Sequence, residues 1–403
     1  MPPLRVDLAI VGAGIVGLAT ALQLRRLAPS LRIALIDKEA RPAQHQSGHN
    51  SGVIHSGVYY RPGSLKASNC QRGYRQLLAF CEAQDIPYDI CGKLIVATQE
   101  SELPYLEQVY QRGVANGLTG IAKIGPAAVR DIEPHIRAVA AIRVPQAGIV
   151  DYRRVAARYA DLLRADGVDC LLGNAVRQIR RSDKRTIVLT DHSEVHARLL
   201  LNCAGLYSDK IAALAGQVSE IQILPFRGEY YELTPAAAGY INHLVYPVPH
   251  PDFPFLGVHF TRMIGGGIEA GPNAVLAFRR EGYSRWDWQA AELWETLRYT
   301  GFRRLAAKHW RMGLGELHRS YSKRAFVRAL QALLPAIQAR DLRRSKSGVR
   351  ATACNPQGEL LDDYHILEDP GIISICNAPS PAATSSLSIG QSLAERVRAH
   401  LGA

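Results

Sequence analysis

A strand, a glycine-rich turn, a helix and a second strand follow one another at the N-terminus, and this unit constrains the fold most. The apolar run 6–11 is followed by glycines at G-x-G-x-x-G spacing. Residues 15–27 are apolar at helical period. A second apolar strand over 32–36 ends at Asp37, twenty residues after the last glycine. This pattern predicts a βαβ unit that binds a dinucleotide.

Each part of this unit has a separate physical task. Gly12 permits a tight turn, Gly14 lets a pyrophosphate approach the main chain, and Gly17 lets helix and strand pack closely. The N-terminus of the helix offers free N–H groups and partial positive charge to the phosphates. Asp37 would accept hydrogen bonds from the adenosine ribose. The cofactor contacts predicted for this unit are Gly12, Gly14, Ile15, Val16, Gly17, Asp37 and Lys38.

Length and composition indicate a folded chain of two domains with no membrane span. At 403 residues the chain exceeds the size of a single core. Its 47% hydrophobic and 21% charged residues are ordinary for a globular protein. The longest apolar runs reach about ten residues, whereas a membrane-spanning helix needs roughly 20. Because the N-terminus enters a strand directly and shows no signal peptide, we expect a cytoplasmic location.

Cysteine usage and net charge narrow the class of protein further. The seven cysteines are scattered and form no CxxC pair, which predicts reduced thiols and no metal site. The formal net charge of +12 suits an acidic small-molecule substrate or a peripheral position on the inner face of a membrane. Nucleic acid is not an expected partner, because the basic residues form no long run and accompany no recognised binding motif.

Later segments divide between the dinucleotide-binding domain and a second domain. Residues 198–216 and 371–400 each read as strand, turn and helix, so we expect both to return to the first domain. Residues 223–235 and 241–273 are β-rich and bounded by proline and glycine, and 284–318 look helical. The sequence predicts an α/β chain with a discontinuous Rossmann-like domain over 1–92, 148–215 and 340–403, and an inserted β-rich α+β substrate domain over 93–147 and 216–339.

The segment QHQSGHNSGVIHSGVYYRPGSLK, residues 44–66, belongs to neither a regular helix nor a flexible linker. It contains too many glycines for the former and too many apolar residues for the latter. Its glycines allow main chain to lie against a planar ring. Its serines and main-chain N–H groups can bond phosphate or the polar edge of such a ring. We therefore interpret the segment as a second contact with the cofactor.

The chain resembles the D-amino-acid oxidase-like flavoproteins, and within them the L-2-hydroxyglutarate oxidase/dehydrogenase family. The resemblance implies non-covalent FAD, a Rossmann-like FAD-binding domain, and oxidation of L-2-hydroxyglutarate to 2-oxoglutarate by hydride transfer to flavin N5. It extends from about residue 5 to residue 395. The similar segments are HQSGHNSGVIHSGVYYRPGSLKA, CGKLIVAT, PFRGEYYEL, FLGVHFTRM, GPNAVLAFRREGY and CNAPSPAATSS.

The resemblance also implies which later residues contact the flavin. In such proteins the segment after the second strand wraps around the flavin. An enzyme that uses a nicotinamide cofactor would not need this second contact segment. Some relatives attach flavin to histidine or cysteine, but His45, His49 and Cys354 are not expected to do so, because the similar group holds FAD non-covalently. The further contacts implied are Gln46, Ser47, His49, Asn50, Ser51, Gly52, Val176, Cys203, Ala204, Gly205, Arg350, Ser380, Ala382, Ala383 and Thr384.

Oxidation of a hydroxy acid requires a base for the hydroxyl proton, and a neutral imidazole suits this task near pH 7. His55 lies in the segment that wraps the flavin, and His259 lies on a presumed strand of the substrate domain. In this fold a strand of that domain usually covers the flavin. Both histidines are candidate catalytic residues, and the sequence does not choose between them.

A dicarboxylate substrate needs cationic or polar anchors, and arginine pairs with carboxylate bidentately. Arg350 is the first candidate and Arg227 the second. The further candidates for substrate binding are Tyr60, Lys66, Tyr230 and Arg262, with Arg61, Tyr59 and Tyr246 in reserve.

Two other functions stay open at this point. The same fold could oxidise another 2-hydroxy acid, an amino acid or an amine. More distantly, it could be a non-catalytic flavin-binding regulatory protein. The sequence also leaves open whether oxygen, a quinone or another carrier accepts the electrons, and it does not indicate the oligomeric state.

Overall fold

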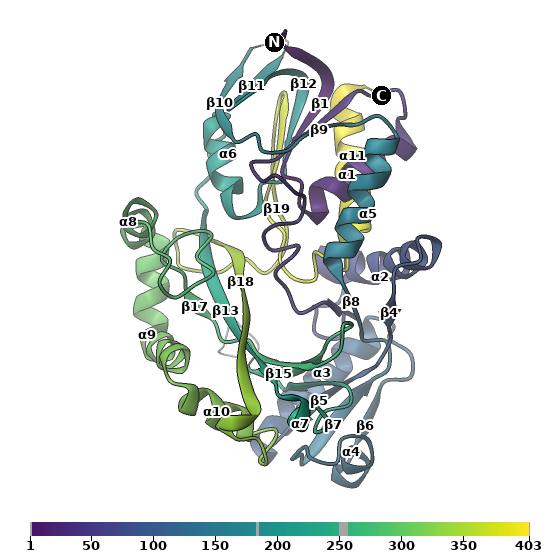
Figure 1. Ribbon diagram of the computed structural model, residues 1–403, viewed down its shortest axis with the longest axis vertical. Helices are drawn as coiled ribbons and strands as arrows, with labels where there is room; N and C mark the ends of the chain where they lie inside the picture. The colour runs from purple at the N-terminus through teal and green to yellow at the C-terminus, as the bar shows by residue number, and fades with distance from the viewer. Residues whose placement is uncertain (1, 183–184, 250–256, 403) are drawn as a thin grey trace.

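The computed structural model describes residues 2–182, 185–249 and 257–402, and arranges them in two lobes (Figure 1). One lobe contains a mostly parallel sheet and both termini. The other contains a larger, mostly antiparallel sheet with helices along its outer side. Residues 250–256, part of a segment predicted to form strands, lie outside the described residues. Among the helices of the described residues, none combines the length and the apolar character needed to cross a membrane.

The first sheet follows from the N-terminal βαβ unit. Its strands are β1 (Leu4–Val11), β2 (Ile33–Ile36), β9 (Asp169–Leu171), β10 (Val176–Arg181), β11 (Thr186–Thr190), β12 (Glu194–Asn202), β19 (His365–Asp369) and β20 (Ile372–Asn377). The strand order is β10-β11-β12-β1-β2-β9, with β20 paired to β12 and β19 to β20. β1 runs parallel to both β2 and β12. The carboxyl ends of these parallel strands therefore meet at one edge of the sheet.

Helices cover both faces of this sheet, which explains why β2 is apolar at every position. The helices of this lobe are α1 (Ile15–Leu27), α2 (Leu65–Ala83), α5 (Tyr152–Ala165), α6 (Ser208–Leu214) and α11 (Ser386–Leu401). α1 packs against α5 and α11, and α2 packs against α11. Contact between α1 and α11 is close, because a Cβ added at Gly390 would lie 2.7 Å from the main chain of Ala19.

The second sheet forms the other lobe. Its strands are β5 (Lys93–Ala97), β6 (Ala122–Ile124), β7 (Ala140–Val144), β13 (Gln222–Leu233), β14 (Leu244–Pro247), β15 (His259–Arg262), β16 (Ile268–Gly271), β17 (Val275–Leu276) and β18 (Leu342–Cys354). The accompanying helices are α3 (Leu103–Ala115), α4 (Pro126–Ile132), α7 (Pro235–Ala238), α8 (Ala290–Arg298), α9 (Thr300–Tyr321) and α10 (Lys323–Gln331). Phe326 of α10 is fully buried, and its ring centroid lies 4.7 Å from that of Tyr231 on β13.

Short elements complete the chain. β3 (Val53–Ile54), β4 (Tyr88–Asp89) and β8 (Gly148–Val150) form a small sheet, with β8 between the other two. The 3-10 turns are η1 (Glu100–Glu102), η2 (Gly205–Tyr207) and η3 (Ala339–Asp341). β3 lies within the glycine-rich segment 44–66, so this segment is partly ordered by strand pairing.

β18 departs from the predicted division of the chain at residue 340. We predicted residues 340–403 as part of the first domain, but β18 pairs with β13 in the second sheet, from Leu342 opposite Leu233 to Cys354 opposite Gln222. Main-chain pairing of this extent attaches β18 to the substrate lobe, and the return to the first sheet begins only with β19 and β20.

Candidate functional site

Main chain crowds the glycine turn after β1, so side chains are excluded there. Gly12 has a φ of +111°, and a Cβ at this position would lie 2.3 Å from the carbonyl oxygen of Cys203. A Cβ at Gly17 would lie 2.1 Å from the carbonyl oxygen of Gly12. The turn after β1 and the Cys203–Gly205 turn after β12 therefore lie against each other, as the sequence predicted for two strand ends of one site.

The N-terminus of α1 has the properties of an anion-binding site. Gly14, its N-cap, provides no side-chain cap, and the first turn contains no acidic residue. Ser47 Oγ accepts a hydrogen bond of 2.9 Å from the Ile15 N–H, which brings the glycine-rich segment next to this turn. With partial positive charge at the helix end and a hydroxyl beside it, these residues fit a pyrophosphate.

Asp37 lies at the carboxyl end of β2, where the ribose of a dinucleotide is expected. Its carboxylate accepts hydrogen bonds from the Ala13 N–H at 2.6 Å and the Glu39 N–H at 2.8 Å. Burial raises the pKa of Asp37, although these N–H groups and the nearby His45 and Lys38 act in the opposite direction. The bonds fix the carboxylate at the edge of the glycine turn, in a position suited to a ribose hydroxyl.

Hydrogen bonds hold the glycine-rich segment between the two lobes. Gln46 Oε1 accepts a bond of 2.9 Å from the Ala351 N–H of β18, and Arg153 Nε of α5 donates to the Gly48 carbonyl at 2.6 Å. The Asn50 amide bonds main-chain groups within the segment, including the Gly52 N–H at 2.9 Å. These bonds satisfy main-chain groups of a segment that forms little regular secondary structure.

The remaining predicted cofactor contacts fall into two groups in the structure. Val176 and Ala204 pack against the buried cluster that includes Val11 and Ile36, near the glycine turn. The Ser380–Thr384 loop, with Ala382 and Ala383 packed against the core of the first lobe, lies beside the segment that contains His55. Thr384 Oγ1 accepts a bond of 3.1 Å from the His55 N–H. The predicted contacts thus lie along the glycine-rich segment, from the glycine turn to His55.

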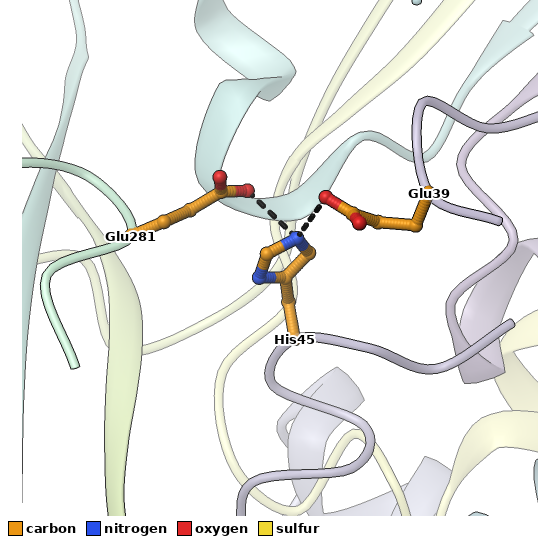
Figure 2. A group of neighbouring side chains, drawn as sticks. All are labelled: Glu39, His45 and Glu281. Carbon is orange, nitrogen blue, oxygen red and sulfur yellow. Dashed lines mark hydrogen bonds and ion pairs between the residues drawn. The ribbon is translucent and has the colours of Figure 1, made fainter. Parts of the chain in front are cut away.

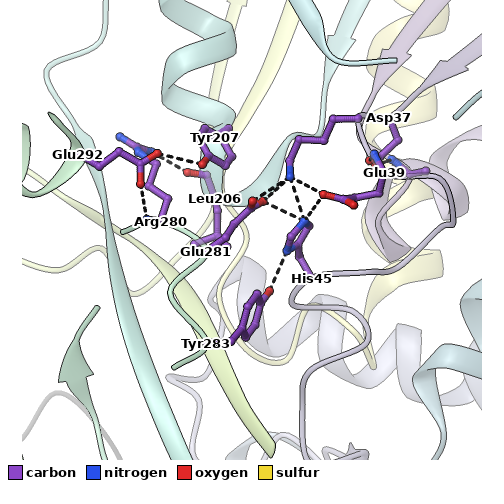
Figure 3. Close-up of polar contacts among 11 residues, drawn as sticks. Asp37, Glu39, His45, Leu206, Tyr207, Arg280, Glu281, Tyr283 and Glu292 are labelled. Carbon is purple, nitrogen blue, oxygen red and sulfur yellow. Dashed lines mark hydrogen bonds and ion pairs between the residues drawn. The ribbon is translucent and has the colours of Figure 1, made fainter. Parts of the chain in front are cut away.

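A polar network joins the two lobes beside Asp37 (Figures 2 and 3). Lys38 Nζ lies 2.6 Å from Glu39 Oε1, 2.8 Å from Glu281 Oε2 and 3.2 Å from His45 Nε2. Burial is the largest single effect on His45 and opposes its protonation, but the bonds to Glu281 and Glu39 and the charge of Glu281 together raise the pKa of the imidazole. Glu39, His45 and Glu281 are close enough to hold a metal ion. Lys38 Nζ already pairs with both carboxylates, so a cation is present at this position.

The same side of the molecule carries a second interlobe contact (Figure 3). Arg280, which is 3% exposed, donates to the Leu206 carbonyl at 2.6 Å and to both Asp209 oxygens at 2.6 and 2.8 Å. Tyr207 donates to Glu292 at the start of α8. These contacts fix the 280–292 segment of the substrate lobe against the turn after β12.

His55 and His259, the two candidate bases, lie close enough for the charge of one to act on the other. Burial, with the positive charges of Lys93 and Lys66, lowers the pKa of His55 to about 3, and His259 is close enough to contribute. Burial also lowers the pKa of His259 to about 3, although its bond to Gly257 acts in the opposite direction. Both imidazoles are therefore neutral near pH 7.

The hydrogen bonds of the two imidazoles differ. His259 Nδ1 lies 2.8 Å from the Gly257 carbonyl, which can only accept, so the proton is on Nδ1 and the Nε2 lone pair is available to act as a base. The ring is stacked on Tyr246, with centroids 3.8 Å apart. His55 Nε2 lies 3.3 Å from the Ser380 hydroxyl, which can donate or accept. Only His259 has its tautomer fixed.

Lys93 is a functional candidate that our sequence analysis missed. It begins β5, is only 2% exposed, and its Nζ lies 4.0 Å from the ring centroid of Tyr246 and 5.5 Å from that of Tyr59. Among the described residues no carboxylate forms an ion pair with it. Burial lowers the pKa of Lys93 to about 8. A buried ammonium held only by ring faces is costly without an anion, which indicates that the site receives one.

The predicted substrate anchors separate into two sets. Tyr230 bonds both Ser51 and Arg350, and the charge of Arg350 also acts on His259, so these residues belong to the histidine cluster. Lys66 joins the cluster from α2, with its Nζ 4.9 Å from the ring centroid of Tyr60 and 2.7 Å from Asp362. Tyr59 adds a buried hydroxyl that has no hydrogen-bond partner among the described residues.

Arg227 and Arg262 are not brought to the cluster. Arg227 is fully buried and bonds Glu229 at 3.2 Å and the Ser284 carbonyl at 3.1 Å. Arg262 is half exposed and pairs with Asp89 at 3.3 Å. Both guanidinium groups are therefore occupied by contacts within the protein.

Fold and site define a flavin-dependent oxidoreductase: a dinucleotide cradle continues into a buried cluster of neutral histidines and cations. The family model for FAD dependent oxidoreductases, DAO, matches residues 7–396. The chain therefore belongs to this family. FAD is its cofactor, and the predicted fold class and oxidoreductase activity are confirmed.

Curated relatives with similar sequences share one name. The chain is 50% identical over 387 residues to the L-2-hydroxyglutarate dehydrogenase of Indibacter alkaliphilus, covering 96% of this chain and 97% of the relative. It is 43% identical to that of Escherichia coli K12, covering 97% and 93%. It is 41% identical to the mitochondrial enzyme of Homo sapiens, covering 97% and 88%. The resemblance stated from the sequence is confirmed.

Solved structures share the fold. The L-alpha-glycerophosphate oxidase of Mycoplasma pneumoniae with FAD bound superposes with a TM-score of 0.79 at 22% identity, covering 98% of this chain and 94% of that chain. Glycine oxidase of Geobacillus kaustophilus gives a TM-score of 0.74 at 16% identity, covering 98% and 95%. Since their identities are low, these structures show the architecture and leave the substrate open.

FAD is expected to be released when the yellow protein is precipitated with acid. His45 is bonded to Tyr283 at 2.8 Å, the His49 ring lies 4.4 Å from the Tyr283 ring, and Cys354 is buried in an apolar cluster. Each of the three side chains is therefore engaged in contacts within the protein. Flavin absorbance should appear in the supernatant, and colour that stays in the pellet would contradict non-covalent binding.

Proposed function

We propose that this chain oxidises L-2-hydroxyglutarate to 2-oxoglutarate. Bound FAD supplies a two-electron acceptor that can take a hydride from the substrate carbon. The observation that carries the proposal is Lys93, a buried ammonium without an ion-pair partner among the described residues, next to two neutral imidazoles. This arrangement suits an anionic hydroxy acid, and the relatives named L-2-hydroxyglutarate dehydrogenase support that substrate.

The cationic side chains would hold the two carboxylates. Lys93 and Arg350 approach the histidines from different strands, β5 and β18, so each can bind one carboxylate of a short dicarboxylate. Lys66 lies at the same cluster but pairs with Asp362. A bound dianion would compensate the desolvated charge of Lys93 and so remove part of the cost of burying it.

The hydroxyl proton would pass to one of the two imidazoles. His259 Nε2 has the lone pair required, because Nδ1 donates to the Gly257 carbonyl. The positive charges that lower the histidine pKa values would be offset by the two carboxylates of the substrate. Each imidazole therefore becomes a stronger base when substrate binds. The substrate thus helps to activate its own base.

An amine or amino acid substrate fits the cluster less well. Its ammonium group would enter a site that already contains Lys93, Lys66 and Arg350, and like charges at short range in a poorly solvated site repel strongly. Another 2-hydroxy acid could bind the same cationic side chains and give its hydroxyl proton to the same imidazoles. A panel of test substrates must therefore include other 2-hydroxy acids. A purely regulatory flavoprotein would not require a buried base.

L-2-Hydroxyglutarate is expected to bleach the flavin under anaerobic conditions, whereas the D enantiomer is not. Two carboxylate anchors and a base for the hydroxyl fix three of the four substituents at the reacting carbon, so only one enantiomer presents its hydrogen to the flavin. The measurement is rapid mixing of the holoenzyme with each acid while flavin absorbance is recorded. Equal bleaching by both enantiomers, or stronger bleaching by an amine, would contradict the proposed substrate.

Electrons would then leave the flavin for oxygen or for a quinone. Oxygen consumption and reduction of a soluble quinone, measured with the same enzyme and substrate, separate these acceptors. We also propose a peripheral position at a membrane surface, for which a specific part of the fold provides an argument.

A further inference from the structure

All four tryptophans of the chain lie on one flank of the substrate lobe, and all are exposed. Trp286, Trp288, Trp294 and Trp310 are 76%, 68%, 61% and 55% exposed. Tryptophan is usually largely buried, so four exposed side chains in one segment require an explanation. α8 and α9 follow each other along this flank (Figure 1).

The second half of α9 carries an apolar stripe that faces solvent. The helix is kinked at His309, and after the kink Trp310, Leu314, Leu317 and Tyr321 recur at i, i+4, i+7 and i+11. This spacing places them on one face of a helix, and all four are exposed. Glu316 and Ser320 of the same helix are buried. The apolar stripe is therefore additional to the face that packs on the protein.

The segment before α8 and α8 itself extend this surface. Arg285 lies with its guanidinium carbon 5.1 Å from the ring centroid of Tyr321, which brings the start of the segment to the end of α9. On α8, Trp294 and Leu297 are exposed. We define the tryptophan surface as Trp286, Trp288, Trp294, Leu297, Trp310, Leu314, Leu317 and Tyr321.

The exposed charges of α8 and α9 are all basic. Acidic residues of the 285–321 segment bond inward: Glu292 accepts from Tyr207 and the Arg280 N–H, Glu295 pairs with Lys210, and Glu316 accepts from the Ala274 N–H. Asp287 is half buried and accepts from the Ser284 N–H. The exposed cationic side chains of the two helices are Arg298, Arg303, Arg304, Lys308 and Arg311.

We infer that the tryptophan surface docks this protein on an anionic membrane interface. Exposed tryptophans with a solvent-facing apolar stripe and flanking arginines are the composition of a helix that lies in the plane of a bilayer surface. Acidic lipid headgroups complement the basic rim, each cation contributing to attraction near the surface. The inward bonds of Glu292 and Glu295 hold α8 to the FAD-binding lobe, so the surface is presented by a fixed scaffold.

A second copy of the chain is the main competing occupant, and the charges argue against it. A symmetric dimer would bring the same basic side chains of both copies into one interface. Like charges there would repel, whereas an acidic headgroup layer has the opposite charge to the exposed cations of the two helices. The membrane interface therefore satisfies the apolar and the charged parts of the surface together.

Holoenzyme sedimented with phosphatidylcholine vesicles containing phosphatidylglycerol is expected to bind them, and to bind pure phosphatidylcholine vesicles much less. Added salt should weaken binding, because exposed charges are screened. Trp310→Ser with Leu314→Ser should lower the partition coefficient by roughly tenfold or more, because two large apolar side chains no longer enter the interface. Arg303→Glu with Lys308→Glu should abolish the preference for phosphatidylglycerol.

A matched control changes exposed apolar residues elsewhere, Leu214→Ser with Val218→Ser, which are 44% and 92% exposed in the wild type. This control should bind vesicles as the wild type does, and every variant should retain flavin and full activity with a soluble acceptor. Absence of binding to phosphatidylglycerol vesicles, or equal binding by all variants, would overturn the inference. A dimer that is lost in the Trp310/Leu314 variant, without vesicle binding, would assign the surface to a second copy instead.

Discussion

Replacing His259 with Gln is expected to slow reduction of the flavin by L-2-hydroxyglutarate by about 10²- to 10⁴-fold, the usual contribution of a positioned base. His259 has its proton fixed on Nδ1 by the Gly257 carbonyl, so Nε2 can take the hydroxyl proton. Glutamine preserves the approximate size and polarity but cannot accept a proton. The measurement is the rate of flavin bleaching in anaerobic single-turnover mixing.

His55→Gln provides the comparison, because His55 lies in the same cluster with Nε2 near the Ser380 hydroxyl. The variant with the larger loss in rate, at unchanged flavin content, identifies the base. A variant that purifies colourless reports a flavin contact instead. If both variants reduce flavin within about tenfold of the wild type, neither imidazole acts as the general base.

The pH profile gives an independent check on this mechanism. The pKa values of both histidines are lowered to about 3, mainly by burial, so the neutral form needed for proton abstraction is already complete far below pH 7. We expect no acid limb in kcat/KM as pH falls from about 7.5 to about 5.5. An ordinary histidine, with a pKa of about 6.5, would lose about tenfold over that interval.

The predicted cofactor contacts depend mainly on local features of the sequence. The glycine turn, α1 and Asp37 are contiguous in the chain, and main-chain contacts exclude a Cβ at Gly12 and at Gly17. The segments that contain β12 and β20 were also expected to return to this domain, because each reads as a strand, a turn and a helix. The spacing of apolar residues and the residue types found in turns are enough to predict strand–turn–helix units of this kind from the sequence.

The substrate half depends on strand register, which the sequence does not display. Arg350 lies opposite Phe226 in the β13–β18 pair, whereas Arg227 lies opposite Val349. Side chains of paired residues share a face, and adjacent residues point to opposite faces. Arg350 therefore reaches the histidines, and Arg227 turns toward Glu229. A shift of one residue in the β13–β18 register would therefore exchange the faces on which the two arginines lie.

Lys93 was missed for a related reason. A lysine before the apolar residues LIVA is typical of the solvent-exposed start of a strand. Its burial arises because β14 lies beside β5 and brings Tyr246, while the glycine-rich segment brings Tyr59. Neither neighbour is close in sequence. The sequence offered one signal for a functional role of Lys93. This lysine lies next to an apolar strand within CGKLIVAT, one of the segments that carry the family resemblance.

Replacing Lys93 with Met is expected to lower kcat/KM for L-2-hydroxyglutarate by roughly 30- to several thousand-fold at saturating acceptor. Removing one partner of a buried, hydrogen-bonded charge pair typically costs about 2–5 kcal/mol. Methionine has a similar length and is apolar, so it keeps the packing against Tyr246 and removes only the charge. Arg350→Ala is expected to produce a loss in the same range.

L-Lactate, which lacks the distal carboxylate, separates the roles of Lys93 and Arg350. Loss of the cation that binds the distal group should impair L-2-hydroxyglutarate far more than L-lactate, and loss of the proximal anchor should impair both. Arg227→Ala serves as the comparison, since its guanidinium is already paired with Glu229. Near wild-type kcat/KM in both the Lys93 and Arg350 variants would place the carboxylates elsewhere, at Lys66 or Arg61.

The alkaline side of the pH profile tests Lys93 specifically. Because burial lowers the pKa of Lys93 to about 8, the ammonium loses its charge as pH rises through this value, and kcat/KM should fall above about pH 8. kcat should change less, because a bound carboxylate stabilises the charged form and raises the pKa in the complex. Lys93→Arg, whose guanidinium stays charged, should lose the alkaline limb and keep more activity than Lys93→Met. A limb that persists unchanged in Lys93→Met would assign that titration to another group and remove Lys93 as an anchor.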